Sequence, residues 1–363
     1  MKNVGIIGCG DISGIYIKNL KGMFAEKVNV AGVCDVRRER ALSRLTEYSA
    51  GKLYASAEEL LADPAVDIAV NLTRPHEHFA VTRAALAAGK HVYSEKPLGA
   101  TPEEGAELAA LAEEKGLLLG CAPDTFLGAG IQTCRKLIDD GRIGDVVAAS
   151  AFMTCRGHES WHPDPEFYYK KGGGPMLDMG PYYITALVAL LGPVCAVSGV
   201  VKTSFATRTI TSREKYGTEV IVDTPTHLAG TVEFECGAVG TVITSFDVHA
   251  AQLPKIEIYG SEGTLSVPDP NTFGGPVKLY LPQDGAFREQ PLLYRYCENS
   301  RGLGVYDMVC HMEDGSPLRV GAPLALHALE VMTGFERSYN SGKYVQLGAK
   351  PPRPAPLEAL LAT

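Results

Sequence analysis

The first 122 residues alternate between short continuous apolar runs and longer stretches with one apolar face. The apolar runs lie at 4–7, 28–34, 68–72, 91–93 and 117–120. Runs of this length without polar alternation are typical of strands that are covered on both faces. The stretches between them predict helices, one of which spans 79–88, and two begin with capping boxes, Ser56 with Glu59 and Thr101 with Glu104. Alternating strands and helices predict an α/β fold built on a doubly wound parallel sheet, a Rossmann arrangement.

The pattern changes after residue 123, where apolar residues fall on every second position, as at Leu228, Val232 and Phe234. Paired stretches of this kind flank glycine-containing turns within 226–248 and 255–267, which predicts two β-hairpins. Helical patterns are expected at 131–140, 181–191 and 323–339. We therefore expect two domains, residues 1–122 and 123–363, the second an α/β domain with a mainly antiparallel sheet.

Composition narrows the class of protein. The net charge is −8 over 363 residues, which gives no support for nucleic-acid binding. The longest apolar stretch, 186–201, contains Gly192-Pro193 and is shorter than the ~20 residues of a membrane helix, so we expect no membrane association. No signal peptide is apparent at the start, and the nine cysteines contain no C-x-x-C pair. The simplest expectation is a cytoplasmic protein with reduced thiols.

A dinucleotide-binding motif follows the first apolar run. Gly8 and Gly10 lie one residue apart, and a predicted helix begins at Asp11 and Ile12. Glycine lets backbone approach a bulky anion, and a helix start directs N–H groups and partial positive charge at it, so this turn is a candidate pyrophosphate site. The third glycine of G-x-G-x-x-G is replaced by Ser13, which is small enough for close packing of helix on strand.

The acid expected for an adenosine ribose follows the second apolar run. Asp35 lies 25 positions beyond Gly10, against roughly 20 in the usual fingerprint. A carboxylate there accepts a hydrogen bond from the 2′-hydroxyl and repels a 2′-phosphate, which favours NAD. Arg37 and Arg38 leave NADP open, because their guanidinium groups would attract that phosphate.

Lys96 is the first candidate for chemistry. Glu95-Lys96-Pro97 follows the apolar run at 91–93, and ligands of parallel sheets lie beyond the carboxyl ends of the strands. An ammonium group there stabilises negative charge on an alcohol or carbonyl oxygen and, with a lowered pKa, passes protons near neutral pH. The alternative is a surface lysine in a turn.

Several of these segments together resemble the Gfo/Idh/MocA family of oxidoreductases. The resemblance rests on the G-x-G turn, Asp35 and four further segments, 73–78 (TRPHEH), 88–92 (AGKHV), 95–97 (EKP) and 172–182, which holds a glycine run, Asp178, Gly180 and Tyr182. It implies a Rossmann domain followed by an α/β domain with a large, mainly antiparallel open sheet, and association through that sheet into a dimer or tetramer. It also implies that NAD, or NADP, contacts a set of residues in the first domain, namely Gly8, Gly10, Asp11, Ile12, Asp35, Arg37, Thr73, His76, His78, Glu95 and Lys96.

Two positions depart from the family pattern. Tyr182 stands where a histidine is usual and Thr185 where an aspartate is usual, although members similar to glucose–fructose oxidoreductase and dihydrodiol dehydrogenase carry the tyrosine. A phenol can donate and accept a proton, but its pKa near 10 makes it a weak base unless a cation lowers that value. We therefore expect Lys96 and Tyr182 to transfer the proton, with Asp178, one helical turn from Tyr182, orienting the lysine or the substrate. The alternative for Asp178 is a helix cap.

Residues 158–165 (HESWHPDP) form the densest polar and aromatic segment and hold the single tryptophan, with three aromatic residues at 167–169. Rings and hydrogen-bonding groups together suit a sugar or glycoside, so Glu159, Trp161 and His162 are expected to contact substrate, together with Lys96, Asp178 and Tyr182. Aromatic packing alone is one alternative. A metal site is the other, but the spacing of His158, Glu159, His162 and Asp164 matches no metal motif, and no metal is expected. Asp124 and Phe126, just past the domain junction, are expected to reach the substrate or to act as a hinge.

The predicted activity is hydride transfer between NAD and a secondary alcohol or ketone of a sugar, cyclitol or glycoside. The E-S-W-H-P-D-P segment resembles oxidoreductases that oxidise a glycoside at C3. Two alternatives remain: an oxidoreductase of dihydrodiols or dicarbonyls, and an NAD(P)-binding sugar sensor without catalysis.

Overall fold

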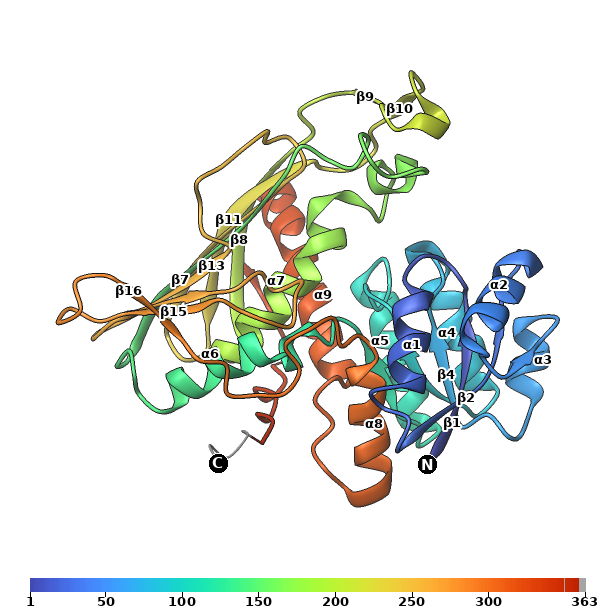
Figure 1. The fold of residues 1–363 in the computed structure, drawn as a ribbon. Helices are drawn as coiled ribbons and strands as arrows, with labels where there is room; N and C mark the ends of the chain where they lie inside the picture. The colour runs from blue at the N-terminus through green and yellow to red at the C-terminus, as the bar shows by residue number, and fades with distance from the viewer. Residues whose placement is uncertain (349, 359–363) are drawn as a thin grey trace. The chain divides into compact units, whose positions relative to one another are not determined.

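The computed structural model describes residues 1–348 and 350–358 (Figure 1). Contacts between residues divide the chain into two units. The first comprises 1–127 and 298–326, and the second comprises 128–297 and the described residues from 327 onward. The sequence-based division at 122 has the second part running unbroken to the end, whereas in the structure the chain returns to the first unit at 298.

The first unit contains a six-stranded sheet in which every pairing is parallel, with the order β3-β2-β1-β4-β5-β6. Its strands are β1 (Lys2–Ile7), β2 (Val28–Cys34), β3 (Lys52–Leu53), β4 (Ile68–Asn71), β5 (His91–Ser94) and β6 (Leu119–Cys121). The order reverses between β1 and β4, which is the point where doubly wound sheets bind ligands. The predicted Rossmann arrangement is confirmed.

Helices pack around this sheet, as the ribbon in Figure 1 shows. Those of the first unit are α1 (Ser13–Lys21), α2 (Arg38–Tyr48), α3 (Ala57–Ala62), α4 (His78–Ala87), α5 (Pro102–Glu114) and α8 (Leu303–Asp314), with the short 3-10 turns η1 (Pro75–Glu77) and η2 (Thr125–Leu127). Both capping boxes form: Ser56 accepts from the Glu59 N–H, and Thr101 accepts from the Glu104 N–H. The core on one face joins strand residues to α3, α4 and α5 through Leu60, Leu86 and Leu108.

Residues 298–326 belong to the first unit because several polar contacts fix them there. The Asn19 side chain donates to the carbonyls of Asn299 and Arg301, each at 2.8 Å. The Cys121 N–H donates to the Val320 carbonyl at 2.9 Å, beside β6. The sequence pattern did not predict α8 in this segment.

The second unit contains a nine-stranded sheet with the order β16-β15-β14-β13-β7-β12-β11-β8-β17. All its pairings are antiparallel except that of β12 with β7, which confirms the predicted large, mainly antiparallel sheet. Its strands are β7 (Val146–Thr154), β8 (Val194–Lys202), β11 (His227–Phe234), β12 (Val239–Ser245), β13 (Ile256–Gly260), β14 (Thr264–Val267), β15 (Val277–Tyr280), β16 (Phe287–Gln290) and β17 (Val345–Gln346).

Helix α7 (Gly174–Leu191) packs against β7, β11 and β12 on one face of this sheet. The predicted helix at 181–191 is thus the second part of a longer one, which begins seven residues earlier and contains Pro181 in its interior. Helices α6 (Ala129–Asp139) and α9 (Ala322–Ser341) and the 3-10 turns η3 (Pro165–Tyr169) and η4 (Arg213–Lys215) complete this part of the chain, and the boundary between the units falls within α9.

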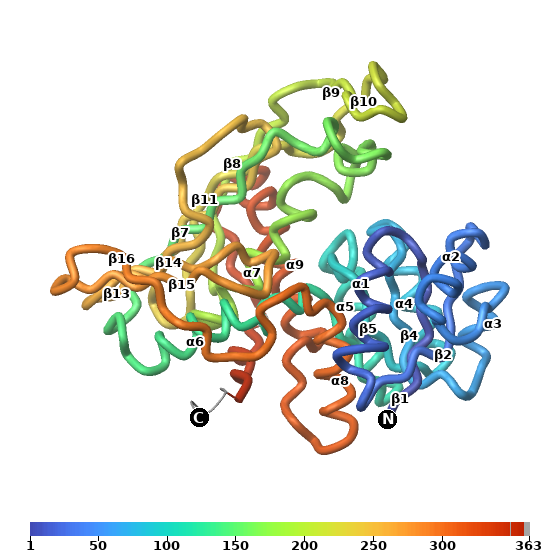
Figure 2. Tube along the Cα trace, in the orientation of Figure 1, coloured from blue at the N-terminus to red at the C-terminus, as the bar shows by residue number. Residues whose placement is uncertain are grey.

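A separate hairpin, β9 (Thr207–Thr209) and β10 (Glu219–Ile221), is inserted between β8 and β11. Figure 2 follows it as an excursion beyond the end of the large sheet. All nine cysteines are free thiols. No helix in the described residues is both long enough and apolar enough for a membrane crossing.

Candidate functional site

The first part of the candidate site is the turn that follows β1. Gly8 has a φ of +98°, and a Cβ on it would lie 2.7 Å from the Leu72 backbone, so only glycine fits there. A Cβ on Gly10 would meet no atom within 4 Å, so the space above this residue is open. Helix α1 begins just beyond, at Ser13, with no side chain capping its first N–H groups. An open glycine next to an uncapped helix start suits a pyrophosphate, so the turn fits a dinucleotide.

Ser13 takes over the packing role of the missing third glycine. It is fully buried, and its hydroxyl donates to the Gly10 carbonyl at 2.6 Å. Arg44 of α2 donates to the same carbonyl at 3.2 Å and to the Ser13 hydroxyl at 3.0 Å. These bonds fix the conformation of the turn and place a guanidinium beside it.

Asp35 lies at the end of β2, where the ribose was predicted to bind. One carboxylate oxygen accepts from the Cys9 N–H and the other from the Arg37 N–H, both at 2.7 Å. The carboxylate is therefore held beside the Gly8–Gly10 turn, and each oxygen keeps a lone pair for a hydroxyl group.

The histidines at 76 and 78 differ in their surroundings. His76 is exposed, and its ring lies 3.3 Å from the Glu77 carboxylate. His78 is buried, and its two ring nitrogens lie 2.8 Å from the Pro97 carbonyl and 3.0 Å from the Thr73 carbonyl. Burial lowers the pKa of His78. In the structure the His78 side chain links the segment after β4 to the segment after β5. The predicted contact of His78 with a cofactor stays a prediction.

Glu95 and Lys96 follow β5 at the carboxyl edge of the parallel sheet. The Glu95 carboxylate accepts from the Tyr16 hydroxyl at 2.8 Å and from the Lys96 N–H at 3.0 Å. Burial raises the pKa of Tyr16, with a further contribution from the Glu95 charge, so the phenol stays protonated as a donor. Glu95 therefore fixes the backbone from which the Lys96 side chain projects.

The structure gives Asp124 and Phe126 buried positions. Asp124 accepts from the N–H groups of Gly302 and Gly304, at 2.9 and 3.0 Å, and so caps α8. Burial raises the pKa of Asp124 to about 6, against the two bonds that lower it. Phe126 is 1% exposed. These contacts give Asp124 and Phe126 packing partners inside the first unit, and the predicted contact with substrate and the alternative hinge role both stay predictions.

Helix α7 carries the candidate residues of the second unit. Asp178 and Tyr182 are four residues apart, so they lie on the same side of the helix. One Asp178 oxygen lies 3.1 Å from His158 Nε2, a partner that the sequence analysis did not find. Tyr182 is 8% exposed and Thr185 is 3% exposed. Asp178 is therefore more than a helix cap, because it links α7 to the segment that follows β7.

An aromatic cluster, which we define as His158, Trp161, His162, Phe167 and Tyr168, surrounds this link. The ring centroid of His158 lies 4.2 Å from that of Tyr168 and 5.2 Å from that of Trp161. His162 lies 5.4 Å from Trp161 and 5.3 Å from Tyr168. Trp161 keeps 62% of its surface exposed, so the cluster offers one large ring face to a ligand.

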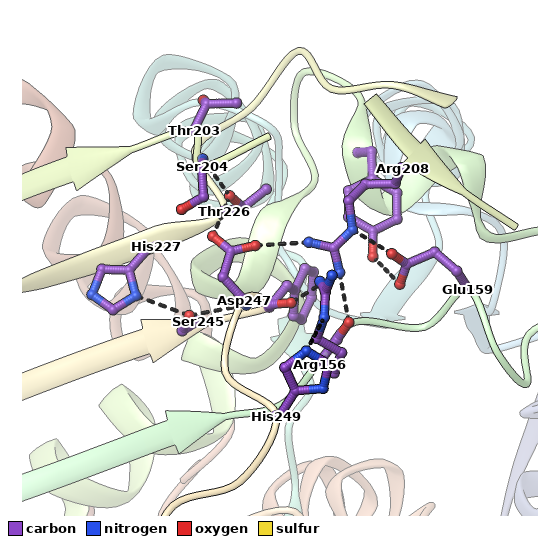
Figure 3. Close-up of polar contacts among 12 residues, drawn as sticks. Arg156, Glu159, Thr203, Ser204, Arg208, Thr226, His227, Ser245, Asp247 and His249 are labelled. Carbon is purple, nitrogen blue, oxygen red and sulfur yellow. Dashed lines mark hydrogen bonds and ion pairs between the residues drawn. The ribbon is translucent and has the colours of Figure 1, made fainter. Parts of the chain in front are cut away.

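Glu159 has a different environment from the one expected for a substrate contact. Figure 3 shows its carboxylate turned toward Arg208 of β9, and the pair is almost fully buried. Its second oxygen accepts from the Tyr169 hydroxyl at 2.5 Å. We therefore assign Glu159 to the buried network and not to the ligand surface. The sequence offered no signal for this, because Arg208 lies 49 positions away.

Two of the four residues considered as metal ligands are engaged in separate ion pairs. Asp164 forms an ion pair with Lys215, whereas Glu159 pairs with Arg208. Within residues 1–348 and 350–358, no three His, Cys, Asp or Glu side chains gather in an arrangement that would hold a metal ion.

Comparison with known proteins matches both halves of the chain to one family. Residues 2–122 match the model described as "Oxidoreductase family, NAD-binding Rossmann fold", and residues 131–266 match the "GFO/IDH/MocA C-terminal domain". The first match shows that the first unit is an NAD-binding Rossmann domain, in agreement with the open turn at Gly10.

A curated relative supports the same family, and a solved structure shares the fold. The chain is 30% identical to 1,5-anhydro-D-fructose reductase of Ensifer adhaerens over 271 residues, 73% of this chain and 75% of the relative. It is 29% identical to trans-1,2-dihydrobenzene-1,2-diol dehydrogenase of Mus musculus over 188 residues, which span 52% of this chain and 56% of that relative. A solved levoglucosan dehydrogenase, in complex with NADH and levoglucosan, shares the fold with a TM-score of 0.81 at 19% identity, over 96% of this chain and 99% of that one.

Proposed function

Because this chain belongs to the GFO/IDH/MocA family of NAD-binding oxidoreductases, we propose that it is a dehydrogenase that interconverts a secondary alcohol and a ketone on a sugar, cyclitol or glycoside. The observation that carries the proposal is the combination, in one chain, of two units. One is the NAD-binding unit. The other has a helix that sets a carboxylate and a phenol one turn apart, beside an aromatic cluster with one exposed ring.

In the proposed reaction, a bound nicotinamide would accept the hydride that leaves the alcohol carbon. The chain itself has to manage the hydroxyl proton. We assign Lys96 to hydrogen-bond the substrate oxygen and to stabilise negative charge on it. We assign the relay of this proton to Tyr182, because a phenol can both donate and accept a proton. Asp178 is assigned to orient the substrate, and its contact with His158 holds its own carboxylate in place.

The substrate class rests on the relatives and on the aromatic cluster. One relative is named for the reduction of 1,5-anhydro-D-fructose, and a structural neighbour was solved with levoglucosan. An exposed Trp161 next to His162 supplies a flat apolar surface together with a hydrogen-bonding ring, which suits one face of a sugar. For a glycoside, the carbon we propose is C3.

A second candidate is the oxidation of an aromatic dihydrodiol. The similarity to the mouse dihydrodiol dehydrogenase supports it, and the same exposed tryptophan would stack on an aromatic ring.

The test is a substrate panel with purified wild-type protein and with Lys96→Met, each with NAD and NADP. Absorbance of the reduced nicotinamide is expected to rise with a glycoside or sugar in the wild type, and about 100-fold or more slowly in Lys96→Met. Both proteins should bind NADH with similar affinity. Turnover of dihydrodiols alone would favour the second candidate. A flat signal with every polyol, while NAD still binds, would favour a sensor and refute catalysis.

We also propose that the chain forms a dimer or tetramer in the cytoplasm. The sheet face opposite α7 has Val200 at 61% and Val239 at 49% exposure, and exposed apolar side chains on a wide sheet suit a subunit contact. The nine free thiols suit a reducing compartment. Light scattering coupled to size-exclusion chromatography tests the oligomer, and a monomer at micromolar concentration would refute it.

A further inference from the structure

The hairpin β9–β10 carries one inward-pointing charge. Arg208 is 4% exposed, whereas Thr207 and Thr209 on either side of it are exposed. A two-stranded hairpin is marginally stable by itself, so its position depends on what it contacts. Its backbone is tied to the rest of the second unit at both ends of its loop: the N–H groups of Thr211 and Ser212 donate to the Glu159 carbonyl, at 3.0 and 2.8 Å, and the Asp223 N–H, just after β10, donates to the Tyr169 carbonyl at 2.8 Å.

The Arg208 guanidinium joins three segments of the second unit, as Figure 3 shows. It donates through Nε to Glu159, through Nη1 to Asp247 at 2.7 Å, and through Nη2 to the carbonyls of Arg156 and Phe246, at 2.6 and 3.0 Å. Asp247 accepts a further bond from the Thr226 hydroxyl at 2.6 Å. One cation thus faces two buried carboxylates, and loss of the cation would leave both without a counter-charge.

This network lies directly against the backbone that carries His158. Gly157 has a φ of +92°, and a Cβ on it would collide with the Glu159 carboxylate and the Tyr169 hydroxyl. The His158 N–H lies 3.4 Å from the same Tyr169 hydroxyl. The buried network of Arg208, Glu159 and Tyr169 therefore packs against the backbone of residues 157–158 and fixes its position.

The His158 ring transmits this position to α7. Its Nε2 lies 3.1 Å from the Asp178 carboxylate, and its faces are confined by Trp161, Tyr168 and Phe246. A shift in the backbone of 157–158 would move the ring relative to Asp178, because the ring is attached to this backbone and meets Asp178 through one ring nitrogen.

We propose that Arg208 is a positioning residue, which fixes His158 against Asp178 and so sets the geometry of the candidate catalytic helix. Replacing a whole buried ion pair by apolar residues is often neutral for the free energy of unfolding. We therefore attribute the buried charges of this network to the positioning of His158 and not to overall stability. The inserted β9–β10 hairpin then supports the substrate site indirectly, through Arg208, and none of its side chains needs to contact the substrate. This inference rests on the proposed function only for the role of Asp178.

The test compares Arg208→Met with Arg135→Met. Arg135 is a matched control in the same unit: it is 9% exposed and donates to Asp139 and to the carbonyls of Ala189 and Pro354. Ala189 lies near the end of α7, 11 positions beyond Asp178, so this contact is on a different part of the helix from the His158 contact. Tyr169→Phe, which removes one hydroxyl, serves if Arg208→Met does not fold. Arg208→Lys keeps the positive charge but lacks the several N–H donors of the guanidinium, so it tests how much of the activity the charge alone restores.

Misplacement of a catalytic group by about 1 Å can cost about 100-fold in rate, so kcat should fall about 10- to 100-fold in Arg208→Met, with a smaller change in KM. Arg208→Lys should recover part of the loss. Arg135→Met should lose a similar amount of thermal stability and keep kcat. Equal kcat in the two methionine variants would overturn the inference.

A second readout does not need turnover. In nitrogen-labelled histidine spectra, the His158 ring signal, assigned by its loss in His158→Gln, should move in Arg208→Met and stay in place in Arg135→Met. If the wild type oxidises no sugar, the proposed function fails, and this signal still decides the inference. An unmoved His158 signal in Arg208→Met would overturn it.

Discussion

The two glycines of the turn after β1 should respond in opposite ways to alanine. In Gly8→Ala the new Cβ would lie 2.7 Å from the Leu72 carbonyl carbon and 2.8 Å from the Thr73 nitrogen, at a φ of +98°. In Gly10→Ala the Cβ would meet nothing within 4 Å. The first substitution therefore tests the fold, and the second tests the binding of the cofactor.

The magnitudes follow from these distances. A non-glycine residue at positive φ costs about 1–3 kcal/mol, and overpacking against backbone costs about 1–3 kcal/mol more. Gly8→Ala should therefore lower the Tm by about 5 °C or more, since 1 kcal/mol corresponds to about 2–4 °C for a domain of 150–250 residues. Gly10→Ala should keep its Tm or raise it slightly, because replacing glycine at an unstrained position stabilises by about 0.4–1 kcal/mol.

The assay measures two quantities on each variant: the Tm without cofactor, and the Kd for NADH from a fluorescence titration. The Gly10 methyl would occupy the space through which a pyrophosphate reaches the backbone, so the Kd should rise about 10-fold or more, or about 1.4 kcal/mol. If Gly10→Ala binds NADH as tightly as the wild type, the placement of the pyrophosphate on this turn is refuted.

Two further predictions concern two carboxylates of the first unit, Asp35 and Asp124. Asp35→Ala should raise the ratio of kcat/KM with NADP to that with NAD by about 10-fold, because it removes the charge that opposes a 2′-phosphate beside Arg37; an unchanged ratio would contradict the ribose assignment. Asp124 has a pKa of about 6 in the folded protein, above its value of about 3.9 in the unfolded chain. Between these two values the folded state binds a proton at Asp124 that the unfolded state has lost. The free energy of unfolding of the wild type should therefore fall as pH rises from 4 to 6, by up to about 3 kcal/mol. Asp124→Asn, which can still accept the Gly302 and Gly304 bonds, should lack this loss in urea unfolding, and parallel stability curves for the two proteins would contradict the burial argument.

The local parts of the fold could be predicted from the sequence because their signals are local. The capping residues Ser56 and Thr101 lie three positions from the groups they bind, and both caps form as predicted. The start of α7 was predicted wrongly. The helix was expected over 181–191, yet it begins at Gly174 and continues through Pro181, which lacks an N–H group and is unusual in a helix interior.

The candidate site was predictable to a different degree in each unit. The Gly8–Gly10 turn and Asp35 are matched by spacing alone, and the structure brings them together. The contacts of Asp178 with His158 and of Glu159 with Arg208 join residues 20 and 49 positions apart, on separate segments. No periodicity links such residues, so the sequence could not separate a ligand contact at Glu159 from a buried ion pair.

The central claim is direct hydride transfer from a substrate carbon to the nicotinamide. The measurement that tests it uses a methyl glycoside deuterated at its ring carbons, mixed with the wild-type protein and NAD, with mass spectrometry of the reduced cofactor. We predict NADH that carries a single deuterium. Reduced cofactor without deuterium, or none formed while NAD is bound, would contradict the claim.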